Sequence, residues 1–253
     1  CHEGSSVNGK HADILSMNNI WDSLIPGTEM AIGGGNALSH PDLVQWLKIL
    51  KSKGVFANIT VNQKHVELYK DLIKSLIDDN LIHGIGISLT DSKTFPSEIV
   101  DSFGDNVVIH TIAGILTEDD LNVLQNRKAL ILGYKMLRRG ESFFSPIIDS
   151  NIKWLADNLA KMTKIASVLS FDCLAIEQLN PQKNLNISTE DWNQYFQGDD
   201  YDVFDNDGNI KCSTFYIDAV EKMVARTSTT PFEKRKPIED NDDIISLFKK
   251  SCS

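Results

Sequence analysis

The chain has 253 residues, of which 42% are hydrophobic and 24% charged, a composition typical of a soluble globular protein with a sizeable core. Its formal net charge of -10 argues against a nucleic-acid-binding surface, which is normally basic. No apolar stretch reaches the roughly 20 residues of a membrane-spanning helix, and four cysteines without a C-x-x-C pair favour a cytoplasmic compartment, so we expect neither a nucleic-acid nor a membrane partner.

Short apolar segments alternate with amphipathic ones through the first 179 residues. Strands are expected over residues 30–32, 55–61, 81–89, 106–112, 129–134 and 166–174. Helices are expected over residues 12–24, 41–53, 63–79, 97–103, 118–126 and 146–162. This alternation indicates βαβ units around a parallel sheet that is buried on both faces. The sheet could be doubly wound or a partial (β/α) barrel, and the steady repeat without a Rossmann fingerprint favours the barrel.

The alternation ends after residue 179. An irregular stretch, two antiparallel strands, a charged linker and a terminal helix are expected over residues 180–207, 210–217, 223–229, 234–241 and 242–250. The sequence therefore predicts an α/β protein with two parts. A partial (β/α) barrel of parallel strands occupies residues 1–179, and a small C-terminal α+β appendage occupies residues 180–253.

Three consecutive glycines follow the first expected strand. Gly33, Gly34 and Gly35 precede Asn36, and the next helix opens at Pro41. Glycine has no Cβ, so a ligand can lie directly against the backbone, and α/β proteins bind small molecules at the carboxyl ends of their strands. The spacing matches neither a dinucleotide-binding fingerprint nor a P-loop. The run therefore either makes a tight turn or forms a platform for a ligand.

Polar side chains also occur at the ends of the later expected strands. They are Asn58, Thr60, Asn62, Ser88, His110, Thr111, Tyr134, Lys135 and Asp172. Because the carboxyl ends of parallel strands meet at one edge of a sheet, these residues predict a common ligand site. Each alone could instead bond the backbone of a neighbouring loop, and His110 could be a core imidazole. Asp172 could accept a hydrogen bond from a ligand amine or cap a loop.

The glycine run resembles a motif of the radical S-adenosylmethionine (radical SAM) enzymes, and the resemblance covers most of residues 1–179. In that family a glycine-rich G-G-E/D motif binds the amino group of SAM, and a Cys-x3-Cys-x2-Cys loop binds a [4Fe–4S] cluster. Residues 33–42, G-G-G-N-A-L-S-H-P-D, are similar to the first motif, with Gly35-Asn36 where the acidic residue usually stands. Cys1 is similar to the last cysteine of the cluster loop, so the other two cysteines would precede this chain, and activity is expected of a longer one.

The resemblance implies a cofactor-binding set along the strands that follow. Its members are Gly33, Gly34, Gly35, Asn36, Asn58, Thr60, Asn62, Ser88, His110, Gly133 and Tyr134. It also implies SAM and a [4Fe–4S] cluster as cofactors, with Cys1 as a metal ligand, a reductant such as flavodoxin or ferredoxin, and a small-molecule or peptide substrate. The implied reaction is reductive cleavage of SAM, after which a 5'-deoxyadenosyl radical abstracts hydrogen from an unidentified substrate.

Two other interpretations are open. The Gly35-Asn36 departure is consistent with a degenerate, non-catalytic barrel that binds a nucleotide-like ligand or a protein partner. A cluster-free lyase or isomerase would instead use Lys135 or Asp172. A zinc site near Cys1 is not indicated, because neither an H-x-x-x-H nor an H-E-x-x-H spacing is present.

Overall fold

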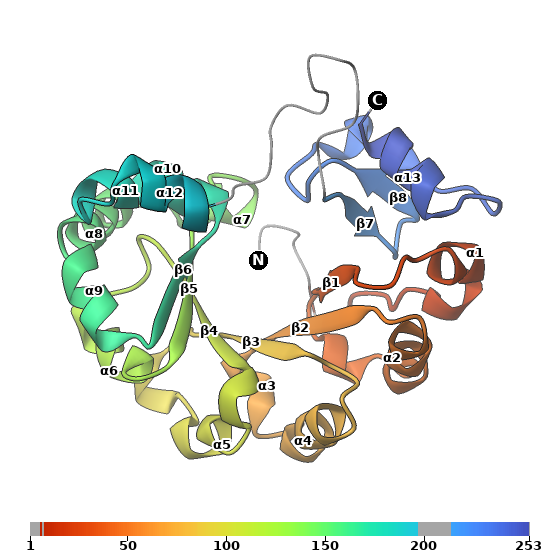
Figure 1. Cartoon of the computed structure of the whole chain (residues 1–253), viewed down its shortest axis with the longest axis horizontal. Coiled ribbons are helices and arrows are strands. Elements are labelled where there is room, and N and C mark those ends of the chain that lie inside the picture. The colour runs from red at the N-terminus through yellow and green to blue at the C-terminus, as the bar shows by residue number, and fades with distance from the viewer. Residues whose placement is uncertain (1–5, 7, 197–213, 253) are drawn as a thin grey trace.

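The computed structural model describes residues 6, 8–196 and 214–252, and within them the chain is an α/β protein with two sheets (Figure 1). The larger sheet has six parallel strands, which confirms the predicted parallel sheet. Its strands are β1 (Glu29–Ile32), β2 (Phe56–Asn62), β3 (Gly84–Ser88), β4 (Val107–Ile112), β5 (Lys128–Leu132) and β6 (Val168–Phe171).

Helices connect these strands. The first part of the chain contains the 3-10 turn η1 (Ile14–Ser16), α1 (Asn18–Asp22), the 3-10 turn η2 (Ala37–Ser39), α2 (Leu43–Ser52), α3 (Gln63–Val66) and α4 (Lys70–Asp78). The next part contains α5 (Ser97–Asp101), the 3-10 turn η5 (Glu118–Asp120), α6 (Leu121–Leu124), α7 (Arg139–Phe143), α8 (Pro146–Asp157), α9 (Leu159–Ile165) and α10 (Cys173–Leu179). The predicted helices over 12–24, 63–79 and 146–162 are therefore each divided into shorter pieces.

The strands of the larger sheet lie side by side in the order in which they occur in the chain. Crossover connections between parallel strands are almost always right-handed, so a sequential order places successive helices on the same face. In Figure 1 the strands form an arc, and α2, α4, α5, α6 and α9 lie along its outer side. The order does not reverse within the described sheet, whereas a reversal is the defining feature of doubly wound folds.

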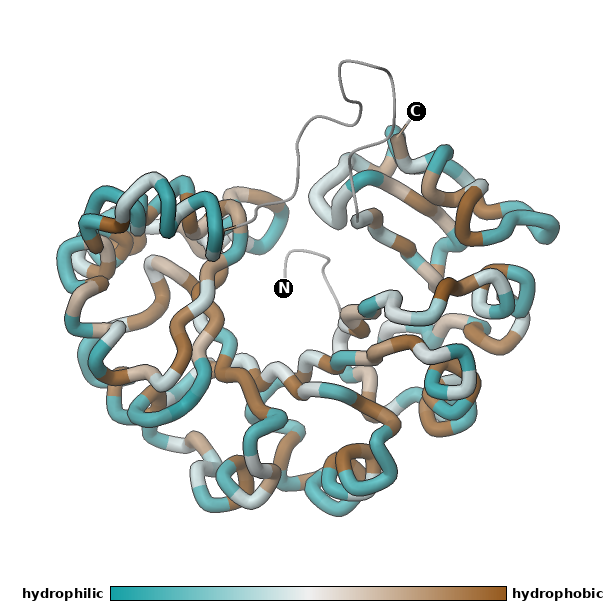
Figure 2. Tube along the Cα trace, in the orientation of Figure 1, coloured by the Kyte–Doolittle hydropathy of each residue, from teal (hydrophilic) through white to brown (hydrophobic). Residues whose placement is uncertain are grey.

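Burial alternates along β2, β4 and β5. In β2 the side chains of Ala57, Ile59 and Val61 are buried, whereas their neighbours Asn58 and Thr60 are only half-buried. Figure 2 shows the same segregation, with apolar segments concentrated in the strands and the adjacent parts of the helices. The prediction that the strands are buried on both faces is thus wrong. Only the outer face, which packs against the helices, is buried. The opposite face, called here the inner face, keeps partial exposure in the part of the chain that the structure describes.

The C-terminal part forms the smaller, antiparallel sheet. Its elements are β7 (Tyr216–Asp218), β8 (Met223–Ala225), β9 (Lys236–Pro237) and the helix α13 (Ile244–Ser251). The pairing of β7 with β8 confirms that the predicted strands are antiparallel, although both are shorter than predicted and residues 210–213 of the first lie outside the described residues. β9 lies within the predicted charged linker. Arg235 is buried and pairs with Asp218 at 2.9 Å, which compensates for the removal of its charge from water.

Two stretches differ from their predicted structure. The predicted irregular stretch after residue 179 contains α11 (Pro181–Asn184) and α12 (Thr189–Tyr195), and the remainder of it, from residue 197 on, lies outside the described residues. The predicted strand 166–174 ends at Phe171, because the next residue begins a helix: Asp172 caps α10 by accepting a hydrogen bond from the Ala175 N–H.

Candidate functional site

Neighbouring strands bring five of the predicted site residues to the inner face of the larger sheet. In the sheet register Asn58 pairs with Gly84, Thr60 with Gly86, and Asn62 with Ser88. Ser88 in turn pairs with His110 on β4. Residues that pair in a parallel sheet point to the same side, because the pleats of adjacent strands are in phase. We call the set Asn58, Thr60, Asn62, Ser88 and His110 the polar face.

The middle strand, β3, has no side chain on this face before Ser88, because its residues there are Gly84 and Gly86. A Cβ at Gly84 would approach the Asn58 Oδ1 atom at 3.0 Å, and a Cβ at Gly86 would overlap the His110 imidazole. The side chains of Asn58 and His110 therefore lean over the β3 backbone from either side. Glycine is required at position 86 for this close approach, because it allows the His110 ring to lie directly against the β3 backbone.

His110 is a neutral imidazole without a hydrogen-bond partner in the described part of the chain. Burial lowers its pKa from 6.5 to about 4, so the ring is uncharged at neutral pH. A neutral imidazole offers one N–H donor and one nitrogen acceptor. Both are available to a ligand on the inner face, because no side chain or backbone group of the described residues bonds to either nitrogen.

The other members of the polar face divide into unbonded and bonded groups. The side chains of Asn58, Thr60 and Ser88 are half-buried and make no hydrogen bond with the described residues. Asn62 differs, since its Oδ1 accepts from the Lys64 N–H at 3.0 Å and caps α3. Three side chains on the same face as His110 therefore have no protein partner and are open to water or to a ligand, so a polar ligand could bind here.

The glycine run begins at the edge of this face. β1 pairs with β2 as far as Ile32 and Ile59, so Gly33 follows directly beside Thr60. Gly33 and Gly34 are exposed, a Cβ added at either would meet no atom within 4 Å, and Gly34 has a φ of +128°. The Asn36 Oδ1 atom is buried and has no hydrogen-bond partner in the described residues. The run thus offers open backbone and one unsatisfied acceptor next to the polar face.

The downstream part of the glycine motif has a structural role. The His40 Nδ1 accepts from the Asp42 N–H at 3.1 Å, so the Nε2–H donates to the Ala12 carbonyl at 2.8 Å. The imidazole also packs edge-on against His11, with ring centroids 5.0 Å apart. His40 therefore links the segment before η1 to the start of α2.

Gly133 and Tyr134 follow β5, and their backbone groups are bonded within the protein. The Asp172 Oδ1 accepts from the Gly133 N–H at 2.8 Å. The Gln178 side chain bonds both the Tyr134 N–H, at 2.8 Å, and the Tyr134 carbonyl, at 2.9 Å. Gly133 is also needed for packing, because a Cβ there would lie 2.6 Å from the Leu174 Cβ. The backbone groups of Gly133 and Tyr134 that the resemblance would offer to a cofactor are therefore already bonded within the protein.

Asp172 and Lys135, the residues of the cluster-free interpretation, both lie in described parts of the chain. Asp172 acts as the N-cap of α10, which is the second of its two predicted roles, and Lys135 is half-buried after β5. Cys1, the predicted metal ligand, lies outside the described residues. Among the residues that are described, no group of three or more His, Cys, Asp or Glu could hold a metal ion. The same residues include no helix that is long and apolar enough to cross a membrane.

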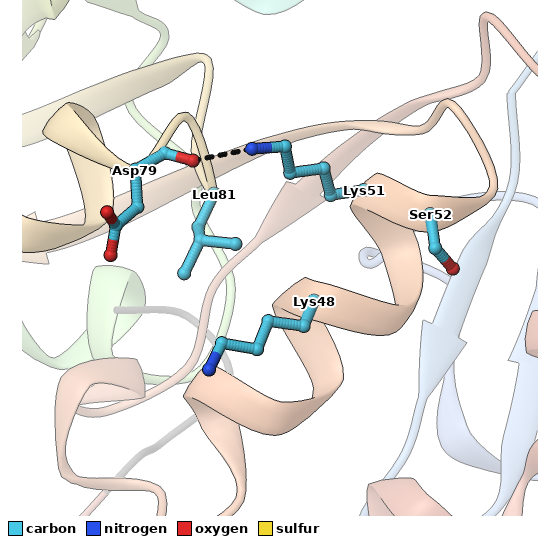
Figure 3. Close-up of a pocket in the computed structure, with 5 residues that line it drawn as sticks. All are labelled: Lys48, Lys51, Ser52, Asp79 and Leu81. Atoms are coloured by element: carbon cyan, nitrogen blue, oxygen red, sulfur yellow. Dashed lines mark hydrogen bonds between the residues drawn. The ribbon is translucent and has the colours of Figure 1, made fainter.

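A surface pocket of about 560 Å³ lies elsewhere, on the outer side of the sheet (Figure 3). Lys48, Lys51 and Ser52 of α2 line it together with Asp79 and Leu81, and the Lys51 Nζ donates to the Asp79 carbonyl at 2.6 Å. Leu81 precedes β3, so the pocket lies toward the amino ends of the strands. It contains none of the predicted site residues.

Comparisons of the chain with protein-family models, with curated proteins and with solved structures found no match. The candidate site therefore depends on geometry alone. Two of its residues, Gly84 and Gly86, were missed in the sequence. The alternation G-I-G-I-S within an apolar strand is the signal that could have found them, because glycine in a strand often marks a close approach by another group.

Proposed function

We propose that the protein is a radical SAM-type enzyme that binds SAM across the glycine run and the polar face. One observation supports this more than any other: Asn58, Thr60, Ser88 and His110 lie on one face of the adjacent strands β2, β3 and β4, and their side chains have no hydrogen-bond partner among the described residues. Polar groups that no protein group satisfies are suited to a ligand with several hydroxyl, amino and ring nitrogen groups. SAM is the ligand of this kind that the family resemblance implies.

The sheet is interpreted in this proposal as a partial (β/α) barrel. The sequential strand order, the arc of the strands in Figure 1 and the position of the helices on its outer side all support that interpretation. In (β/α) barrels the ligand lies at the carboxyl ends of the strands. Gly33, Asn62 and Ser88 lie at or just beyond these ends, and His110 pairs with Ser88.

Each group has a role that follows from its chemistry. The open backbone at Gly33 and Gly34 allows close contact with the amino-acid part of SAM, and the side-chain Oδ1 of Asn36 is an acceptor for its ammonium group. Thr60 and Ser88 can each donate to and accept from ribose hydroxyls. The neutral His110 avoids repulsion of the positively charged sulfonium, which a protonated imidazole would cause.

The cluster itself is assigned no ligands among the described residues, because they contain no suitable group. Cys1 is the residue that would contribute a thiolate according to the resemblance. When bound, the cluster supplies the electron for the cleavage of SAM. The role of the described residues is to bind and orient SAM and to keep water from its reactive carbon.

One alternative is favoured by a specific observation. The Asn36 side chain stands where the family usually has a carboxylate, and an amide binds an ammonium group less strongly than a charged oxygen does. A degenerate barrel that binds a nucleotide-like ligand without cleaving it would have the same polar face. Binding and cleavage must therefore be measured separately.

The test is a calorimetric titration of the full-length protein with SAM, together with a 5'-deoxyadenosine assay under anaerobic, reducing conditions. The proposal predicts saturable binding and release of deoxyadenosine. Binding without deoxyadenosine supports the degenerate barrel. Failure to bind SAM contradicts the proposal.

A further inference from the structure

Gln63 is a buried polar residue that directly follows Asn62, the last residue of β2. It is 3% exposed, whereas glutamine in proteins is mostly exposed unless its amide is hydrogen-bonded. Its Oε1 accepts from the Thr90 N–H at 2.7 Å and from the Asp91 N–H at 3.1 Å. Its Nε2 donates to the Asp91 carbonyl at 2.8 Å and to the Thr94 Oγ1 at 3.2 Å. The two donors and two acceptor sites of this amide are therefore all used on one loop.

The loop held by this side chain follows Ser88, the last residue of β3. Ser88 pairs with Asn62 on β2, directly before Gln63. The next residue, Leu89, donates its N–H to the His110 carbonyl on β4 at 2.8 Å. The Gln63 amide and this backbone bond together join the carboxyl ends of β2, β3 and β4. These are the three strands that carry the polar face.

We propose that Gln63 is a positioning residue for the polar face: it fixes the end of β3 against the end of β2 and thereby holds Ser88 in place for the ligand. This inference rests on the proposed function for the identity of the ligand, SAM. Gln63 itself does not touch the ligand, because its side chain is buried and its amide is fully bonded within the protein.

The surroundings of the loop explain why such a residue matters for binding. Thr90, Asp91 and Thr94 are all exposed, so the loop lies at the surface, where connections are usually mobile. Four hydrogen bonds to one buried amide restrict this motion, because a buried network with every group satisfied is rigid. A site that is already ordered binds its ligand without the entropy cost of ordering a loop.

The test is a double-mutant cycle, measured by calorimetric titration of the full-length protein with SAM. Gln63→Met nearly keeps the size of the side chain and removes all four hydrogen bonds. Ser88→Ala removes the hydroxyl group that Gln63 is proposed to position. We expect Gln63→Met to weaken SAM binding about tenfold in the wild type and only about threefold in Ser88→Ala, because part of its effect acts through Ser88. An equal fold-change in both backgrounds, or no change in either, would overturn the inference.

Two further variants separate positioning from a loss of stability. Leu155→Ala creates a cavity at a fully buried residue of α8, outside the polar face, so it should destabilise the fold and leave the SAM affinity unchanged. Thr94→Val removes one of the four bonds at an exposed position and should weaken SAM binding about twofold. If Gln63→Met does not fold, an unchanged affinity of Thr94→Val overturns the inference.

A measurement without ligand separates this inference from the proposed function. In protein with ¹⁵N-labelled histidine, Gln63→Met should shift the ring nitrogen signals of His110 before any SAM is added, because Leu89 links the held loop to His110. The signals of His83, which precedes β3, should stay in place. Failure of the wild type to bind SAM contradicts the proposed function alone, and unchanged His110 signals in Gln63→Met overturn the positioning role.

Discussion

Two regions of the larger sheet contain similar residues and differ in how these are bonded. On β2, β3 and β4 the side chains of Asn58, Ser88 and His110 have no hydrogen-bond partner among the described residues. After β6, by contrast, the side chains of Asp172 and Gln178 accept hydrogen bonds from the backbone N–H groups of the loop that follows β5. The residue types alone do not distinguish the regions, because Asn, Asp and Gln serve a ligand or a loop equally well.

The difference follows from the local backbone. After β6 a helix starts almost at once, and its first N–H groups need an acceptor, which Asp172 provides. The N–H groups of the loop after β5 have no partner in the sheet, and they donate to the side chains of Asp172 and Gln178 instead. Across β2 to β4 the strand backbones satisfy each other, so the side chains remain available. This contrast can be tested by substitutions in both regions.

The largest effect is expected from Gly133→Ala. The added Cβ would lie 2.6 Å from the Leu174 Cβ and 2.7 Å from its backbone carbonyl carbon, so α10 would have to move. We expect the free energy of unfolding, measured in urea, to fall by about 3 kcal/mol. Gly33→Ala is the control, and its unfolding free energy should change by less than about 0.5 kcal/mol, because that Cβ would meet no atom. Equal effects of the two substitutions would contradict the contrast.

Asp172→Ala should be the next most destabilising change. It removes one oxygen that accepts from both the Gly133 and the Ala175 N–H groups, which leaves two backbone donors without a partner. The expected loss in unfolding free energy is about 2 to 3 kcal/mol. Asp119→Ala, at an exposed position in η5, should leave stability nearly unchanged. A small effect at Asp172 would show that its capping bonds contribute little.

The pH dependence of stability should show the lowered pKa of His110. Its folded pKa of about 4 lies below the 6.5 of a free histidine, so between these values the unfolded chain binds more protons than the folded one. Stability is therefore unaffected above pH 6.5 and falls as the pH is lowered toward 4. By pH 5 the wild type should have lost about 2 kcal/mol relative to His110→Gln. The same pH dependence in both proteins would contradict the burial of a neutral ring; His83→Gln serves as the exposed control.

The smallest effect is expected from Thr60→Val, and it concerns binding. The substitution keeps the shape of the side chain and removes the hydroxyl group that is proposed to contact SAM. One hydrogen bond contributes about 1 kcal/mol, so the affinity measured by calorimetry should fall about fivefold. Thr163→Val, on the exposed surface of α9, is the matched control and should bind as the wild type does. An unchanged affinity at Thr60 would remove this residue from the proposed site.

The sequence predicted the repeating framework well because that framework depends on local patterns. Segments such as V-V-I-H-T-I alternate between a buried and a partly exposed side, and the structure has β4 there. The start of α10 was missed although Asp172 is a good N-cap residue, because the apolar residues on both sides of it suggested a continuous strand. The helix α12 was missed although the S-T-E-D segment at 188–191 is a typical helix start, because its polar composition suggested a loop.

The candidate site was predictable in outline and not in detail. The shared face of Asn58, Thr60, Ser88 and His110 could be recognised from the sequence, since strand period and order give it. The predicted place at the strand ends was wrong for Asn58 and Thr60, which lie within β2. Their lack of hydrogen bonds could not, because it depends on which loop donors lie nearby. The pKa of His110 was equally out of reach, since burial over Gly86 involves packing between two strands.

The central claim, that the polar face is a binding site, is tested most directly by the imidazole nitrogen NMR signals of protein with ¹⁵N-labelled histidine. His110 lies on the polar face, whereas His83 precedes β3 and packs edge-on against Phe56, with ring centroids 5.3 Å apart. Titration with SAM should shift the ring nitrogen signals of His110 to saturation and leave those of His83 in place. SAM that binds without any change at His110, or that does not bind at all, would contradict the claim.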